Sequence, residues 1–229
     1  MRTRKHSGAG ALTLALAVTV AGVPICLRVA AAAEPPREWD GLELRDSKSV
    51  DRLYLRPGAS LTGYKKVRLA PLQVEFDKNW DPNRGRVGSN RLTAKDFETI
   101  KKTLAEAFAQ VSKEELGKGG YELVNTPGDD VLDVAPLIMN LYIVAPDKQT
   151  AGRSRTYTSE AGQMTLVAEM RDSDTGTILA RVVDSQRMGS STTWRITNSV
   201  TNLGDAKRII IAWASALRHA LDVANGKPG

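Results

Sequence analysis

The sequence predicts an α+β two-layer sandwich: a mainly antiparallel sheet of about five strands with two amphipathic helices on one face. Three observations predict this class. Residues 161–186 alternate apolar and polar side chains in two runs separated by a turn. Residues 93–111 and 202–224 repeat apolar side chains at steps of three and four, as amphipathic helices do. Residues 131–144 are almost wholly apolar, which is typical of a central strand.

The hairpin at residues 161–186 is the most specific of these signals. A turn centred near Asp174 joins its two runs, and Gly176 supplies the positive φ that a type I turn with a bulge requires. The turn and the alternation then predict the same register, in which the apolar residues of both arms share one face. The predicted pairs are Met170 with Ile178, Ala168 with Ala180, and Leu166 with Val182.

Local sequence signals predict the elements of the first half of the chain. Residues 34–60 are polar and proline-containing, which indicates an extended lead-in before a single α+β domain at 61–229. Residues 64–76 alternate as the first long strand, in which Pro71 marks an edge or a bulge. Thr93 and Asp96 then have the spacing of a capping box, so a helix is expected to begin there.

The second half is assigned in the same way. Residues 121–124 predict a short strand, and the long apolar run that follows is interrupted by Pro136, where we expect a bulge or a break. Asn202 with Asp205 predicts the N-cap of the last helix, which ends before the turn residues 225–228.

The first 33 residues resemble an export signal. Basic residues precede an apolar run at 9–26, and three alanines stand before Glu34, so cleavage is expected after Ala33. A retained membrane anchor is the weaker alternative, because Pro24 interrupts a run already short for the ~20 residues of a span. A lipid on Cys26 is a third alternative, although Ile25 stands where a lipoprotein signal has a small residue. The expected location is periplasmic or membrane-associated in the cell envelope.

Charge and cysteine content exclude several functions of the exported chain. Cleavage would remove four of the 32 basic side chains and leave 28 against 26 acidic ones, a net charge near +2 in place of +6. Nucleic acid is therefore not an expected partner. The mature chain would contain no cysteine, which excludes disulfides and thiol catalysis.

No motif for catalysis, a cofactor or a metal stands out. His219 would be the only histidine of the mature chain, which excludes zinc sites built from histidine and cysteine and leaves a solvated helix position as the simplest interpretation. The acidic stretches at 129–133 and 172–174 have the composition of turns. Paired carboxylates of this kind would also serve a hydrolase, if two of them met in a cleft.

A candidate interaction surface comes from three polar loops, at 77–90, 145–160 and 188–201. Arginine pairs with carboxylates or phosphates, and tyrosine or tryptophan stacks on rings, so such loops are where binding residues concentrate. A solvated loop with an aromatic residue packed on the fold is the alternative, and single-stranded nucleic acid is a weaker option as ligand. The candidate residues are Trp80, Arg153, Arg155, Tyr157 and Trp194.

Several segments together resemble one family. They are WDGL at 39–42, YLRPGASLTGYKKVRLAPLQVEFDKNW at 54–80, PGDDVL at 127–132, RSRTYTSEAGQMTLVAEMRDSDTG at 153–176, and NSVTN ahead of WASALR in the last helix. The resemblance is to bacterial exported proteins and lipoproteins classed only as domain of unknown function 3313. It implies an envelope location, no established activity and no catalytic residues.

The sequence therefore favours a non-enzymatic binding or interaction module of the cell envelope, without a cofactor. Its expected partner is an envelope protein or polymer, and peripheral association with the membrane is a further expectation. The alternative function is a carboxylate-based hydrolase acting on an envelope polymer.

Overall fold

The structure, a computed structural model, describes residues 35–88, 91–144, 156–158, 161–189, 195–197 and 199–227. Residues Pro36–Gly229 belong to one compact unit. Its helices are α1 (Ala94–Lys118) and α2 (Ser199–Ala224). Its strands are β1 (Glu38–Trp39), β2 (Leu42–Arg45), β3 (Arg52–Leu55), β4 (Lys66–Leu69), β5 (Gln73–Phe76), β6 (Glu122–Leu123), β7 (Val131–Ile143), β8 (Thr156–Thr158), β9 (Gly162–Asp172), β10 (Ile178–Met188) and β11 (Arg195–Thr197).

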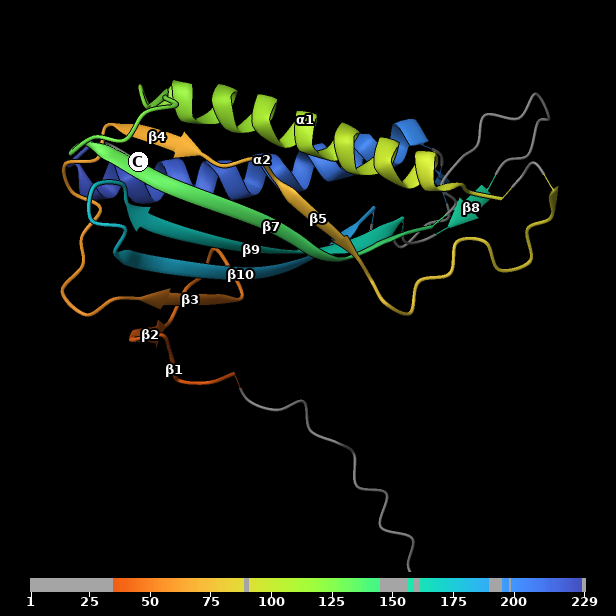
Figure 1. The fold of residues 1–229 in the computed structure, drawn as a ribbon, viewed down its shortest axis with the longest axis horizontal. Coiled ribbons are helices and arrows are strands. Elements are labelled where there is room, and N and C mark those ends of the chain that lie inside the picture. The colour runs from red at the N-terminus through yellow and green to blue at the C-terminus, as the bar shows by residue number, and fades with distance from the viewer. Residues whose placement is uncertain are drawn as a thin grey trace, which may run out of the picture. The chain divides into compact units, whose positions relative to one another are not determined.

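One large sheet holds nine of these strands (Figure 1). Its order is β1-β2-β3-β10-β9-β7-β4-β6, and β5 pairs with β7 beyond the end of β4. The pairs of β4 with β6 and β7, and of β5 with β7, are parallel, whereas the other pairs are antiparallel. The α+β class and the mostly antiparallel sheet are confirmed. The sheet is mixed, however, and the expected number of about five strands is too low.

The missed strands are short, and this is why periodicity did not reveal them. Residues 36–60 contain β1, β2 and β3, which are at most four residues long. A strand of four residues shows at most two repeats of the apolar–polar alternation, which is too few to recognise. The strand expected at 64–76 is two strands, since residues 70–72 leave the ladder around Pro71, which has no N–H to donate.

The hairpin exists, with a register that differs from the predicted one by two residues. Met170 pairs with Ala180, and Ala168 pairs with Val182. A bulge between Ile178 and Ala180 lengthens the connection between the two strands and so shifts their register. Gly176 has φ of 68° there, and its N–H donates to the carbonyl of Asp172 at 2.9 Å. A shift of two preserves the faces of both strands, so the apolar side still lies under the helices.

The long strand β7 bulges at a different place from the one expected. The irregularity lies between Met139 and Tyr142, where Asn140 has φ of 53°. Pro136 instead lies in the interval of β7 between its pairing with β4, which ends at Val134, and its pairing with β5, which begins at Leu137. No ladder bond is lost on that side, so the proline is tolerated there.

Both helices cover the same face of the sheet. The capping box is confirmed. The Thr93 N–H donates to the Asp96 carboxylate at 2.7 Å, and the Asp96 N–H donates back to Thr93, whose carbonyl oxygen is 3.0 Å away. The predicted N-cap of α2 is wrong, since the helix begins at Ser199 and Asn202 lies within it, donating to the carbonyl of Val144 at 3.2 Å. The core between the layers contains Leu104, Phe108, Val111, Ile138, Met164, Leu166, Ala206, Ile210 and Trp213.

Candidate functional site

The aromatic candidate Trp80 is held by packing at the end of β7. Its ring stacks on Phe76, with centroids 5.1 Å apart, and meets the ring of Phe97 edge-on at 6.0 Å. Its indole N–H donates to the carbonyl of Ile143 at 3.1 Å. These contacts join the loop after β5 to α1 and β7, which is the structural role expected of an aromatic residue fixed to the fold.

The other four candidates cannot be placed around Trp80. Arg153, Arg155 and Trp194 lie outside the described residues. Tyr157 is in β8, and its backbone pairs with Ile196 of β11, which brings the loops after β7 and β10 together. The proposed surface of three loops therefore stays a prediction.

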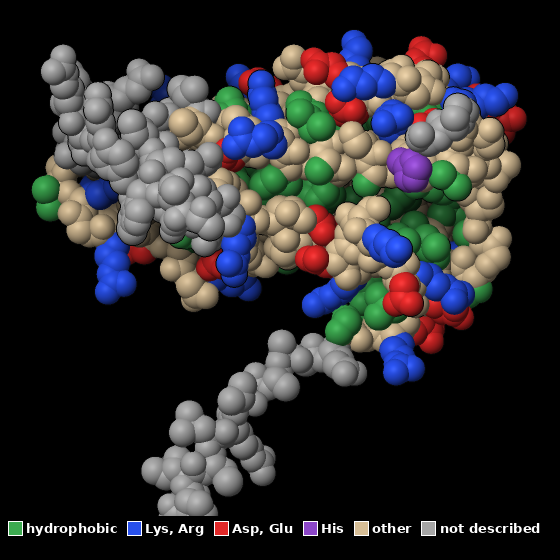
Figure 2. Space-filling view, turned by 180° about the vertical axis from the view of Figure 1, so that it is seen from behind, with side chains coloured by type: hydrophobic (Ala, Val, Ile, Leu, Met, Phe, Trp, Pro, Cys, Tyr) green, Lys and Arg blue, Asp and Glu red, His purple; other side chains and the backbone are tan. Residues whose placement is uncertain are grey.

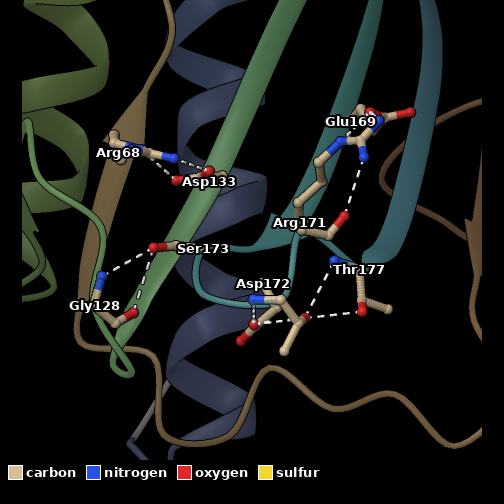
Figure 3. A network of polar contacts seen from close by, with 10 residues as sticks. Arg68, Gly128, Asp133, Glu169, Arg171, Asp172, Ser173 and Thr177 are labelled. Atoms are coloured by element: carbon tan, nitrogen blue, oxygen red, sulfur yellow. Dashed lines mark hydrogen bonds and ion pairs between the residues drawn. The ribbon is translucent and has the colours of Figure 1, made fainter.

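The acidic stretches hold turns and strands in place (Figure 3). Asp172 accepts hydrogen bonds from the N–H and hydroxyl of Thr175, both at 2.8 Å, and from the hydroxyl of Tyr64 at 2.7 Å. The Tyr64 bond, followed by those of Thr175, lowers the pKa of Asp172. Ser173 bonds to the backbone of Gly128 at 3.0 Å, and so ties the hairpin turn to the loop before β7.

Two further carboxylates of these stretches pair with basic residues of β4. Asp130 pairs with Lys66 at 3.1 Å, and Asp133 forms a two-bond pair with Arg68. In the described part of the chain, no group of three or more histidine, cysteine, aspartate or glutamate side chains is arranged to hold a metal ion. Asp130, Asp133 and Asp172 thus have structural partners, and no observation favours the hydrolase alternative.

An apolar groove of about 390 Å³ lies beside and beneath α2. Figure 2 shows it as a hollow with hydrophobic walls, and a histidine side chain marks its rim. The sheet supplies its floor through Leu53, Leu55, Leu179, Ala180 and Val182. The helix supplies one wall through Trp213, Ala216, Leu217, Ala220 and Val223. Two loops supply the opposite side through Ser47, Ser49, Val50, Ala59, Ser60 and Leu61.

The groove exists because the sheet is wider than its helical cover. Strands lie about 4.8 Å apart and packed helices about 8–10 Å apart, so two helices cover roughly four strands. The sheet path contains eight strands. Beyond α2, the described residues that face the apolar side of β10 and β3 belong to the loops at residues 46–51 and 57–63.

A buried carboxylate fixes one end of the groove. Asp184 of β10 is 2% exposed and accepts hydrogen bonds from Trp213 Nε1 at 2.7 Å, Asp51 N–H at 2.9 Å and Gln186 Nε2 at 2.8 Å. Asp51 in turn accepts from the N–H of Ser185 at 2.9 Å. One side chain therefore joins the floor, the helix and the loop at residues 46–51.

The other end is fixed by the C-terminal turn of α2. The hydroxyl of Thr62 donates to the carbonyl of Ala224 at 3.0 Å, and the N–H of Gly63 donates to Asn225 at 2.9 Å. Asn225 also donates to the carbonyl of Tyr64 at 3.2 Å. These bonds hold the loop at residues 57–63 against the helix, so both loops of the groove are anchored.

Buried polar bonds set the position of α2 itself. The hydroxyl of Ser215 donates to Glu115 of α1 at 3.1 Å, and Lys118 forms an ion pair with the same carboxylate. Lys118, and then Ser215, lower the pKa of Glu115 against the opposing effect of burial. Farther along, Asp222 accepts from Tyr121 at 2.9 Å. The groove wall is thus preformed, as small-molecule sites usually are.

The lining of the groove is free of formal charge. Among the described residues that form it there is no lysine, arginine, aspartate or glutamate, and the polar members are four serines and His219. Ser47 accepts from the N–H groups of Ser49 and Val50, and Ser60 donates to Thr62, so both are occupied within their loops. The lining therefore selects for apolar surface and against ions.

Sequence reasoning identified the inner face of α2 but missed the groove. The predicted buried stripe consists of Ala206, Ile210, Trp213, Leu217, Leu221 and Ala224. It does not include the apolar residues between these members. The missed signal was that Ile211, Ala212, Ala216 and Val223 make α2 apolar on a second side, where a surface helix normally carries charge.

Comparison with known proteins places this chain in a family. It matches the family described as protein of unknown function (DUF3313) over residues 36–217. The chain belongs to that family, as the sequence motifs predicted. No curated protein matches it.

Three solved structures are similar to the chain. A variant of the PelC dodecamer from Paraburkholderia phytofirmans is 10% identical, covers 72% of this chain and 95% of its own, and has a TM-score of 0.38. Protein XCC0632 from Xanthomonas campestris, of family DUF330, is 13% identical over 74% of this chain and 90% of its own, with a TM-score of 0.34. A PDZ domain protein from Parabacteroides distasonis is 8% identical over 70% and 32%, with a TM-score of 0.33.

Proposed function

We propose that the protein is a non-enzymatic binding module of the cell envelope whose ligand is an uncharged apolar group held in the groove beside α2. The observation that carries this proposal is the groove itself: about 390 Å³, anchored at both ends, with an uncharged lining. Its volume lies within the range of ligand pockets, and burying apolar surface there is favourable by about 25 cal/mol per Å².

The environment proposed for this module is outside the cytoplasm. The supporting observations are the basic, apolar and alanine-rich segments of residues 1–33. In the described part of the chain, no helix is long and apolar enough to cross a membrane. Cell fractionation followed by mass analysis tests this directly. In protein recovered from the envelope, a chain beginning at Glu34 supports cleavage, a lipid-modified Cys26 supports lipid attachment, and an intact N-terminus supports a retained anchor. Recovery from the cytosolic fraction alone contradicts export.

The binding function is tested with the neutral apolar dye N-phenyl-1-naphthylamine, whose fluorescence rises in apolar surroundings. We expect the wild-type protein to bind it with saturation. Ala216→Glu places a carboxylate in the groove wall, and desolvation of that charge should weaken binding at least about tenfold.

The matched control for this test is Ala212→Glu. Ala212 is exposed on the same helix, one turn earlier, and does not line the groove. Both changes introduce the same helix-favouring side chain, so a difference in dye binding reports the groove and not helix stability. Equal binding by the two variants would show that the dye binds elsewhere.

A further inference from the structure

The groove offers no backbone partner to a peptide. Strand β10, which forms its floor, is paired with β9 on one side and with β3 on the other. A strand added to a sheet needs a free edge, and the N–H and C=O groups of an extended peptide would otherwise be buried unpaired. The chemistry of the floor therefore favours a ligand that has no hydrogen-bonding groups along its length.

The size of the groove leads to the same ligand class. The volume of the groove is about 390 Å³. The same volume equals about thirteen groups of the size of a water molecule, at about 30 Å³ each. A methylene group is of similar size, so one unbranched hydrocarbon chain of about a dozen carbons fits.

The exposed side of α2 continues from this groove. We define the α2 strip as Ile211, Ala212, His219, Ala220 and Val223. Ile211 is 41% exposed and Val223 is 62% exposed, and the last three residues of the strip also line the groove. The strip contains no acidic side chain, and the two aspartates of the helix, Asp205 and Asp222, are buried at 3% and 2% exposure. An apolar strip without carboxylates suits the surface of a bilayer.

We propose that the groove receives one acyl chain of a membrane phospholipid while the α2 strip lies against the bilayer surface. This inference rests on the proposed function and specifies its ligand. The head group stays outside the groove, since no charged side chain in the lining could pair with it. The strip supplies the route, because a chain leaving the bilayer beside Ala220 and Val223 enters the groove directly.

The test uses the full-length protein with phosphatidylcholine vesicles whose acyl chains carry bromine, which quenches tryptophan fluorescence at short range. Trp213 lines the groove and is therefore the reporter. We expect stronger quenching than with vesicles of the same lipid without bromine. Trp213→Phe should lose this difference and so identify the residue that is quenched, with the other three tryptophans as the baseline. All variants share residues 1–33, so any contribution of that segment cancels.

Two substitutions separate the groove from the strip. Ala216→Glu should reduce the bromine-specific quenching at least about tenfold in apparent affinity, because it places a charge in the wall. Ile211→Asp changes the strip but not the groove lining, so it should weaken quenching by vesicles while dye binding in solution stays within about twofold of wild type.

The outcomes distinguish this inference from the function on which it rests. Bromine-specific quenching that Ala216→Glu and Ile211→Asp both reduce supports the phospholipid chain. Saturable dye binding without quenching by brominated vesicles overturns the phospholipid and leaves the binding module standing. Quenching by a free brominated fatty acid but not by vesicles assigns the groove to a soluble lipid and overturns the membrane source. Failure of the dye and of both lipids overturns the proposed function as well.

Discussion

The same sheet face is closed under the two helices and open beyond them. Ile138 lies under α1 and α2 and is 0% exposed, whereas Leu53 and Val182, farther along that face, are only partly buried and line the groove. The side chains are of the same kind in both regions. What differs is the cover, which is a packed helix layer in one region and two anchored loops in the other. The site thus arises from a mismatch in width between layers, and it requires no reactive residue.

The first prediction tests whether the two regions differ in energy. Ile138→Ala should lower the free energy of unfolding by about 2–5 kcal/mol, because it leaves a cavity among helices and strands that cannot close around it. Leu53→Ala should lower it by only about 1 kcal/mol, since that side chain already contacts solvent. Urea denaturation of the purified variants measures both values. Equal losses would mean that the groove is packed as tightly as the core.

The second prediction concerns the residue at the border of the two regions. Asp184→Ala should lower the free energy of unfolding by about 2–3 kcal/mol, because the Trp213 and Asp51 N–H groups lose a charged acceptor. Dye binding should weaken as well, since the loop at residues 46–51 loses its anchor. Gln186→Ala, which removes an exposed donor to the same carboxylate, is the control and should change dye binding little, because Gln186 belongs neither to α2 nor to the loop at residues 46–51. A destabilised Asp184→Ala protein that binds dye normally would show that the groove does not depend on this anchor.

The closed region was largely predictable from the sequence, and the open one was not. The stripe of α1 and the faces of the hairpin follow from periods of 3.6 and 2, which are local properties. The register needed the bulge before Ala180, and the start of α2 at Ser199 carries no helix-start signal stronger than the one at Asn202. The groove depends on how many strands meet two helices, which is a property of the whole sheet. The family was predictable because its motifs span most of the chain.

The third prediction, with the smallest effect, concerns how stability depends on pH. It comes from Tyr64 and Asp172, which belong neither to the closed region nor to the groove. Burial, and then the hydrogen bond to Asp172, raises the pKa of Tyr64, while that bond and those of Thr175 lower the pKa of Asp172. A lowered carboxyl pKa adds stability that is present above the unfolded value of about 3.9 and is lost as the pH falls through it. A raised tyrosine pKa adds stability that is present below the unfolded value of about 10 and is lost as the pH rises above it.

Tyr64→Phe should therefore lower the free energy of unfolding by about 1 kcal/mol at pH 7, because Asp172 loses one donor. The loss of stability below pH 4 should become shallower, and so should the loss above pH 10. The alkaline loss should not vanish, since burial and the bond to Asp222 also raise the pKa of Tyr121. Urea denaturation from pH 3 to pH 11 measures both limbs. Because Tyr64 does not line the groove, dye binding should be the same in the variant at every pH where it is folded. A parallel change in dye binding would mean that the hairpin turn and the groove are coupled, and that the open region is not separable from the rest of the sheet.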